Sequence, residues 1–107
     1  MITMVELLVR ADGYSHEAFL ERWQGEHAEL ARELPGLKRY STSAPTNPEE
    51  VQYDGVLQLT FESEAAMNEA WASEVGEEVM ADAAEFVEIG AGPRMVVEDT
   101  VHVDVDE

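Results

Sequence analysis

One amphipathic segment, between residues 14 and 40, constrains the fold of this chain more than any other. Its large apolar side chains recur every three or four positions with charged side chains between them, which is the spacing of a helix with one buried face. Ser15 stands at an N-cap position, and Pro35 with Gly36 ends helical geometry. The spacing therefore predicts a helix from about Ser15 to Glu33, followed by a turn into a strand.

His27 lies on the apolar stripe of this helix rather than among its glutamates. At about 100° per residue it shares a face with Phe19, Trp23 and Leu30, so an ionisable ring is directed at the core. In one interpretation it is a partly buried histidine bonded to a backbone carbonyl, which residue statistics favour. In the other it faces a pocket as an acid, a base or a hydrogen-bond donor, because its ordinary pKa is near neutrality.

Several short motifs accompany this helix in a fixed order. A strand-like segment, MVELLVR, precedes it, and the helix carries F-x-x-x-W-x-x-x-H at Phe19, Trp23 and His27. L-P-G-L then leads into a strand with Tyr40, and Trp71 and the segment MADAAEFVE follow, with the spacing Asp-x-x-x-Phe. In this order the motifs resemble an EthD-family domain, and the resemblance covers nearly the whole chain.

The resemblance implies a fold, an assembly and a chemistry. The fold is α+β, a ferredoxin-like β-α-β-β-α-β sandwich, in a single EthD-like domain over residues 1–107. Proteins of this group form a dimeric α+β barrel, so a homodimer is implied. EthD proteins are associated with oxidative degradation of ethers and with oxidoreductase-type chemistry. Related barrels include cofactor-independent monooxygenases, polyketide cyclases and lactone isomerases.

The rest of the pattern gives the same order of elements. Apolar or alternating segments predict strands at Ile2–Arg10, Leu37–Ser43, Val51–Phe61 and Met95–Val105. Ser63 caps a helix through Ala72, and Ser73 caps a further helical segment through Phe86. The resulting order, β-α-β-β-α-(α)-β, is that of the split βαβ motif.

The charge of the chain is strongly one-sided. Asp and Glu number 24 against 6 Lys and Arg, giving a formal net charge of −18. Such a chain repels phosphate backbones, which argues against nucleic-acid binding. The carboxylates are spread over every predicted helix rather than gathered in a tail, so they resemble the acidic surfaces of proteins from salt-in halophiles. No long apolar run or signal-like segment is present, and we expect a cytoplasmic protein without membrane association.

Cofactor and metal motifs are absent from the sequence. There is no cysteine, which excludes disulfides and thiolate chemistry. His16, His27 and His102 have no recognised metal-ligand spacing, and no phosphate-binding glycine loop or nucleophile elbow occurs. We therefore expect neither a metal nor an organic cofactor.

Two positions leave alternatives open. Glu6 interrupts an apolar strand, and we favour a place at the sheet edge in solvent. The alternative is a cavity-facing carboxyl opposite His27, whose pKa burial would raise. Trp71 is predicted as a core anchor rather than a ligand-stacking residue.

The leading hypothesis is a small, mostly apolar pocket for an organic molecule, with cofactor-independent oxidative or cyclisation chemistry. The family motif supports Trp23 as an apolar wall and His27 as general acid or base, and Tyr40 matches a common family position as hydrogen-bond donor. Tyr53 and Glu6 are added from the residues alone. The alternatives are a non-enzymatic dimeric binding or accessory protein for a hydrophobic metabolite, and a structural dimer without an occupied pocket.

Overall fold

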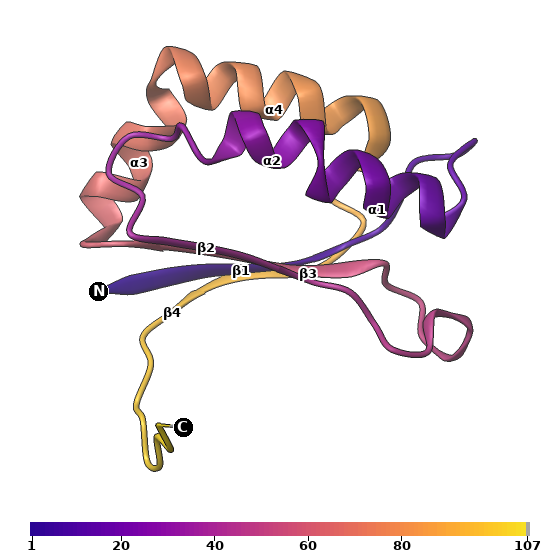
Figure 1. Cartoon of the computed structure of the whole chain (residues 1–107). Helices are drawn as coiled ribbons and strands as arrows, with labels where there is room; N and C mark the ends of the chain where they lie inside the picture. The colour runs from indigo at the N-terminus through magenta and orange to yellow at the C-terminus, as the bar shows by residue number, and fades with distance from the viewer. Residues whose placement is uncertain (107) are drawn as a thin grey trace.

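Helices cover one face of a four-stranded sheet in the computed structural model, which describes residues 1–106 (Figure 1). The strands are β1 (Ile2–Leu8), β2 (Arg39–Ser43), β3 (Gly55–Phe61) and β4 (Arg94–Val97). They lie in the order β2-β3-β1-β4, and all neighbours are antiparallel. The helices are α1 (His16–Gln24), α2 (Glu26–Ala31), α3 (Glu64–Ala72) and α4 (Glu74–Phe86), with a 3₁₀ turn η1 (Pro48–Glu50). The α+β ferredoxin-like prediction is confirmed.

The core lies between the sheet and the helices. Met4 on β1 pairs with Leu59 on β3, and both side chains are almost fully buried under the helices. Phe19, Trp23 and Phe86 form a second cluster nearer the start of α1. Because side chains alternate along a strand, the same register directs Glu6, paired with Leu57 and Arg94, toward the helices.

The predicted single helix from Ser15 to Glu33 is wrong, because the chain breaks at Gly25 and the second helix ends at Ala31. Gly25 has φ −103° and ψ −107°, outside helical geometry. A Cβ atom there would lie 2.6 Å from the carbonyl oxygen of Glu21. The glycine is therefore required by the break, which the apolar spacing does not reveal because it continues across both helices.

All four predicted strands are longer than those observed. β1 ends at Leu8 rather than Arg10, β2 begins at Arg39 rather than Leu37, β3 begins at Gly55 rather than Val51, and β4 ends at Val97 rather than Val105. Val97 pairs with Thr3 at the start of β1, so a longer β4 would have no strand to bond to. Residues 98–106 consequently leave the sheet and extend away from the body (Figure 1), although their valines alternate as in a strand.

All three predicted serine caps are confirmed. Ser15 Oγ accepts a hydrogen bond from the Ala18 N–H at 3.0 Å. Ser63 Oγ accepts one from the Ala66 N–H, and Ser73 Oγ accepts one from the Gly76 N–H, both at 3.1 Å. Each cap satisfies an N–H group that the first helical turn leaves open. None of the helices described here is long and apolar enough to cross a membrane.

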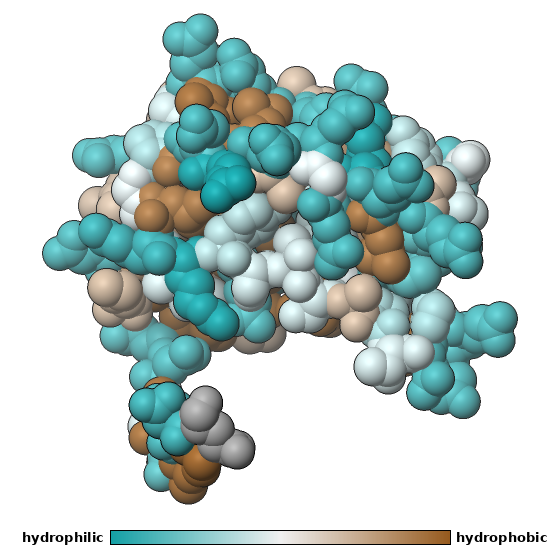
Figure 2. All heavy atoms as spheres, viewed as in Figure 1, coloured by the Kyte–Doolittle hydropathy of each residue, from teal (hydrophilic) through white to brown (hydrophobic). Residues whose placement is uncertain are grey.

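The sheet face opposite the helices has no layer over it. Val5, Leu7 and Val56 are half-buried on this face, and Met95 on β4 is 60% exposed. The extended segment beyond β4 adds three more exposed valines, which are Val101, Val103 and Val105. Figure 2 shows hydrophobic residues within this segment, in contrast to the mostly hydrophilic body.

Candidate functional site

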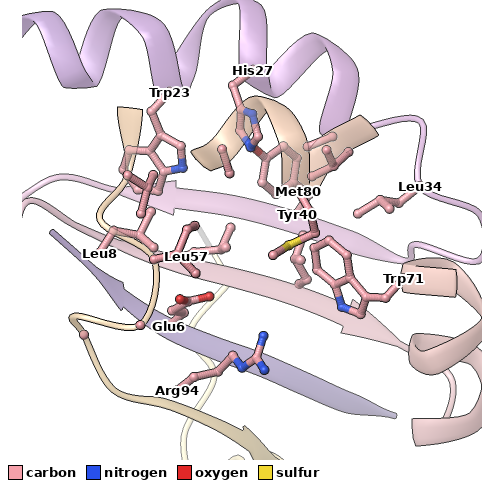
Figure 3. A pocket seen from close by; sticks show the side chains of 18 residues that line it. Glu6, Leu8, Trp23, His27, Leu34, Tyr40, Leu57, Trp71, Met80 and Arg94 are labelled. Carbon is pink, nitrogen blue, oxygen red and sulfur yellow. The ribbon is translucent and has the colours of Figure 1, made fainter. Parts of the chain in front are cut away.

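A cavity of about 240 Å³ lies between the sheet and helices α1, α2, α3 and α4. In Figure 3, Trp23 and Trp71 stand at its two ends, His27 enters from the helix layer and Glu6 from the sheet. Most of the remaining lining is apolar, including Leu8, Leu34, Leu57, Leu59, Val79, Met80 and Val87. An engineered cavity of ~150 Å³ holds benzene, so this one suits a molecule of one or two rings.

His27 is placed in the wall of this cavity by α2. Its side chain is buried, and its ring meets the Phe86 ring edge-on at a centroid distance of 5.0 Å. The partner of the ring is a carboxylate rather than the backbone carbonyl of the first interpretation: Nδ1 lies 2.7 Å from Oδ2 of Asp82 on α4.

Asp82 determines which ring nitrogen of His27 carries the proton in the neutral imidazole. Burial favours its neutral acid, but hydrogen bonds from His27 and Arg22 outweigh burial and hold the pKa of Asp82 below its ordinary value. An ionised carboxylate accepts only, so His27 Nδ1 carries the proton. In the neutral tautomer that fits this bond, the other ring nitrogen, Nε2, is the acceptor, on a ring that lines the cavity.

Arg22 on α1 holds Asp82 from the other side. Its Nη2 donates to Asp82 Oδ1 at 2.6 Å, and its Nη1 donates to the Tyr14 hydroxyl at 3.2 Å. The guanidinium also lies 5.2 Å from the centroid of the Phe86 ring. The arrangement Arg22–Asp82–His27 links α1, α4 and α2, and it orients the imidazole as a carboxylate orients a catalytic histidine.

Tyr40 on β2 brings a hydroxyl to the same cavity. Burial raises the pKa of Tyr40 to about 12, so the group is a neutral donor at physiological pH. Within residues 1–106 the buried oxygen has no hydrogen-bond partner.

Glu6 lies in the cavity and not in solvent at a sheet edge, so the alternative we favoured for it is wrong. β1 is a central strand, and the position of Glu6 in the pleat faces the helices. Burial raises the pKa of Glu6, and the Arg94 charge on the neighbouring strand opposes that rise. The carboxyl and guanidinium groups lie together on the sheet side of the cavity (Figure 3).

Of the predicted site residues, Glu6, Trp23, His27 and Tyr40 come together around one cavity. Trp23 is 1% exposed and packs so closely on Gly55 that a Cβ there would lie 2.4 Å from its ring. Tyr53 lies elsewhere, in a separate hollow beside Leu7 and Val56. The roles of these residues remain predictions.

Arg22 and Arg94 were not predicted as site residues, and Asp82 entered only as the first residue of the Asp-x-x-x-Phe spacing, without a role. A signal for Asp82 does exist: on a helical wheel it lies about 40° from Phe86, at the edge of the apolar stripe of α4. Among so many exposed carboxylates that position does not stand out. Within residues 1–106 no group of three or more His, Asp or Glu side chains is arranged to hold a metal ion.

A second buried carboxylate, Asp54, lies outside the cavity lining. It accepts from the Arg10 N–H at 2.9 Å and from Arg10 Nη1 at 2.7 Å, and its Oδ1 lies 2.8 Å from His16 Nδ1. Burial favours the neutral form, but these hydrogen bonds hold the pKa of Asp54 below its ordinary value. This cluster ties the end of β1 to the start of α1 and the entry to β3.

Residues 11–90 match the family described as EthD domain. The chain belongs to the EthD family. It is 32% identical over 96 residues, 82% of this chain and 91% of the relative, to an uncharacterized 11.0 kDa protein from the thcB-thcC intergenic region of Rhodococcus erythropolis. The EthD resemblance inferred from the motifs is therefore confirmed.

Solved structures share the fold at low sequence identity. An EthD family protein from Bacillus halodurans has a TM-score of 0.76 and 19% identity, over 94% of this chain and 100% of that one. A dimeric protein of unknown function with a ferredoxin-like fold from Bacteroides fragilis has a TM-score of 0.71 and 12% identity, over 92% and 95%. SnoaB, a cofactor-independent oxygenase from Streptomyces nogalater, has a TM-score of 0.67 and 12% identity, over 99% and 97%.

Proposed function

We propose that this EthD protein binds a small organic molecule in the cavity at His27 and removes a proton from it, in cofactor-independent chemistry of the oxidoreductase or cyclisation type. The observation that carries the proposal is the Asp82–His27 pair, in which an ionised carboxylate engages Nδ1 of an imidazole that lines an apolar cavity and leaves Nε2 as the nitrogen for a ligand. The fold shared with a cofactor-independent oxygenase supports it.

The first step would be transfer of a proton from the bound molecule to His27 Nε2. Asp82 stabilises the imidazolium formed, and the Tyr40 hydroxyl stabilises the enolate oxygen left behind. In an oxidative reaction this carbanion would give two electrons to dioxygen and form a C–O bond, and the peroxide anion would take the proton back from His27 as a hydroperoxide. In a cyclisation it would attack a second carbonyl carbon of the same molecule, whose C=O π bond breaks, and the alkoxide formed would take the proton back from His27. Both routes need the same first step, which is the one that these residues supply.

A thermal-shift screen tests the pocket. In about 2 M KCl, chosen for charge screening, small phenols, quinones, lactones, cyclic ethers and ketones are compared on wild type and His27→Ala. We expect a ligand that raises the melting temperature of wild type by several degrees, but not that of His27→Ala. His102→Ala is the matched control, because His102 is exposed on the extended segment.

The ligand found is then followed in D2O by NMR for exchange of its acidic C–H. Exchange that depends on His27 supports catalysis. Binding without exchange would favour the alternative, a non-enzymatic carrier for a hydrophobic metabolite, for which the mainly apolar lining is also suited. If no compound binds, the structural-dimer interpretation replaces both.

We propose that two copies of the chain associate through the uncovered sheet face to form a dimeric α+β barrel. Half-buried Val5, Leu7 and Val56 and exposed Met95 give this face an apolar centre. The dimeric Bacteroides fragilis protein of the same fold supports the proposal.

Light scattering tests the dimer. We expect a mass twice that of the 11.9 kDa chain for wild type in about 2 M KCl, the concentration needed to screen its charge. Val56→Glu places a charge at the centre of the face and should give monomers. The control Ala84→Glu, at an exposed position on α4, should remain dimeric. A monomeric wild type would contradict the proposal.

We propose that the charge is an adaptation to high salt. Except for Glu6, Asp54 and Asp82, every Asp and Glu among residues 1–106 is exposed. Repulsion among these charges weakens with the Debye length, from ~10 Å at 0.1 M to ~3 Å at 1 M salt. We expect the free energy of unfolding to rise by about 2 kcal/mol or more over that range of KCl, measured by urea denaturation. A stability independent of KCl would refute this adaptation.

A further inference from the structure

Two buried hydrogen-bond donors in the cavity have no partner in the part of the chain that the structure describes. They are the Tyr40 hydroxyl on β2 and the Trp71 indole Nε1 on α3. Two residues far apart in sequence that line one cavity thus each carry an unpaired buried polar atom. A buried donor without a partner is costly to the fold, because the lost bond to water is not replaced.

The Trp71 indole N–H is a donor only, so the ligand atom that satisfies it must be an acceptor. The Tyr40 hydroxyl, whose pKa of about 12 keeps it protonated at physiological pH, can donate as well. A carbonyl oxygen has two lone pairs and can accept from both. His27 Nε2 is the complementary acceptor and suits the acidic hydrogen of the same molecule.

The charges around the cavity favour a neutral ligand. Arg94 faces Glu6 across the β1–β4 pair, and Asp82 is paired with Arg22. No positive charge of the lining is left without a nearby carboxylate among residues 1–106, and the chain as a whole carries a formal charge of −18. An anionic ligand would therefore meet repulsion on approach from the acidic surface.

We propose that the ligand of this cavity is a neutral carbonyl compound of one or two rings whose oxygen accepts a hydrogen bond from the Trp71 indole N–H, with the Tyr40 hydroxyl as second donor. This makes Trp71 a specificity-determining residue and not only a core anchor. The inference rests on the proposed function, since it names the class of molecule that His27 would deprotonate.

Three probes of similar size and different polarity test the assignment: β-tetralone, a neutral ketone; tetralin, the corresponding hydrocarbon; and tetralin carboxylate, an anion. Their affinities are measured by titration calorimetry on wild type, Trp71→Phe and Tyr40→Phe. We expect wild type to prefer the ketone to the hydrocarbon by about 10-fold. Trp71→Phe should remove most of this preference while its melting temperature stays equal or rises, because an unpaired buried donor has been removed.

The indole N–H resonances give a direct measurement. On ketone binding, the Trp71 Nε1–H signal should move downfield, as a new hydrogen bond requires, while tetralin leaves it nearly unchanged. Trp23 is the internal reference, since its indole belongs to the other end of the cavity (Figure 3). A variant that fails to fold would be recognised from its melting curve, and the wild-type spectrum would still decide the assignment.

Equal affinity for ketone and hydrocarbon, tightest binding of the anion, or a ketone preference that survives in Trp71→Phe would each overturn the carbonyl assignment. If tetralin binds as well as the ketone and His27→Ala abolishes binding of both, the pocket of the proposed function stands and only the carbonyl assignment fails. If none of the three binds wild type at millimolar concentration, both proposals fall.

Discussion

Replacing Asp82 by Asn should slow proton transfer at the cavity by about 10²–10³-fold, with little change in ligand affinity. The carboxylate accepts from His27 Nδ1 at 2.7 Å and so selects, in the neutral ring, the tautomer with Nε2 unprotonated. An amide presents either an oxygen or an NH2 group, and in the second case the imidazole takes the opposite tautomer, with Nε2 protonated and unable to act as a base. Because Asp82 does not line the cavity, the binding surface is unchanged.

Two measurements check this. The ¹⁵N shifts of His27 should show a protonated Nδ1 in wild type and a changed tautomer in Asp82→Asn. The rate of C–H exchange of β-tetralone in D2O should fall together with that change. Glu85→Gln is the matched control, since Glu85 lies 3.7 Å from the same Arg22 and is largely exposed. A variant with both the wild-type tautomer and the wild-type rate would exclude Asp82 as a positioning residue.

Asp54→Asn should lower the free energy of unfolding by about 2–4 kcal/mol, the largest stability effect that we expect from one charge-removing change. Asp54 is 4% exposed and holds the Arg10 N–H, the Arg10 guanidinium and His16. The amide leaves Arg10 without a counter-charge. The exposed Asp12→Asn is the control and should change stability by less than about 0.5 kcal/mol.

The pH dependence of this effect has a definite sign. The pKa of Asp54 in the folded state is lowered from a reference of 3.8. The contribution of Asp54 to the free energy of unfolding is therefore complete above that value and is lost as pH falls through the folded-state pKa. The stability difference between wild type and Asp54→Asn should therefore be constant near neutrality and shrink below about pH 4. Urea denaturation at several pH values measures it. A difference that grows on acidification would show that the carboxylate is not stabilised by its neighbours.

The order of elements could be predicted from the sequence because each signal for it is local. Ser63 and Ser73 cap helices from within one turn, and the apolar spacing around Trp23 and Phe86 sets which face is buried. Element ends were less predictable where they depend on distant residues. β4 ends at Val97 because Val97 pairs with Thr3, near the start of β1. Thr3 lies 94 residues before Val97 in the sequence, so no local pattern marks this end.

The site was predictable only in part for a similar reason. Helical periodicity directed His27 inward, and the family motif supplied Trp23. Periodicity alone cannot supply the partner of His27, because Asp82 is 55 residues away and meets it only when α2 packs on α4. The same holds for Glu6, whose exposure depended on whether β1 became an edge or a central strand.

The acidic residues of this chain fall into two groups, a few that are buried or half-buried and many that are exposed. Glu6 lines the cavity, Asp82 bonds to His27 and Asp54 bonds to Arg10, while the remaining described Asp and Glu face solvent. A redesign for dilute buffer can therefore exchange exposed glutamates of α3 and α4 for lysine or glutamine and leave these three in place. We expect such a redesign to change the salt dependence of stability while the cavity stays intact, so that adaptation to a new salt concentration need not alter ligand binding.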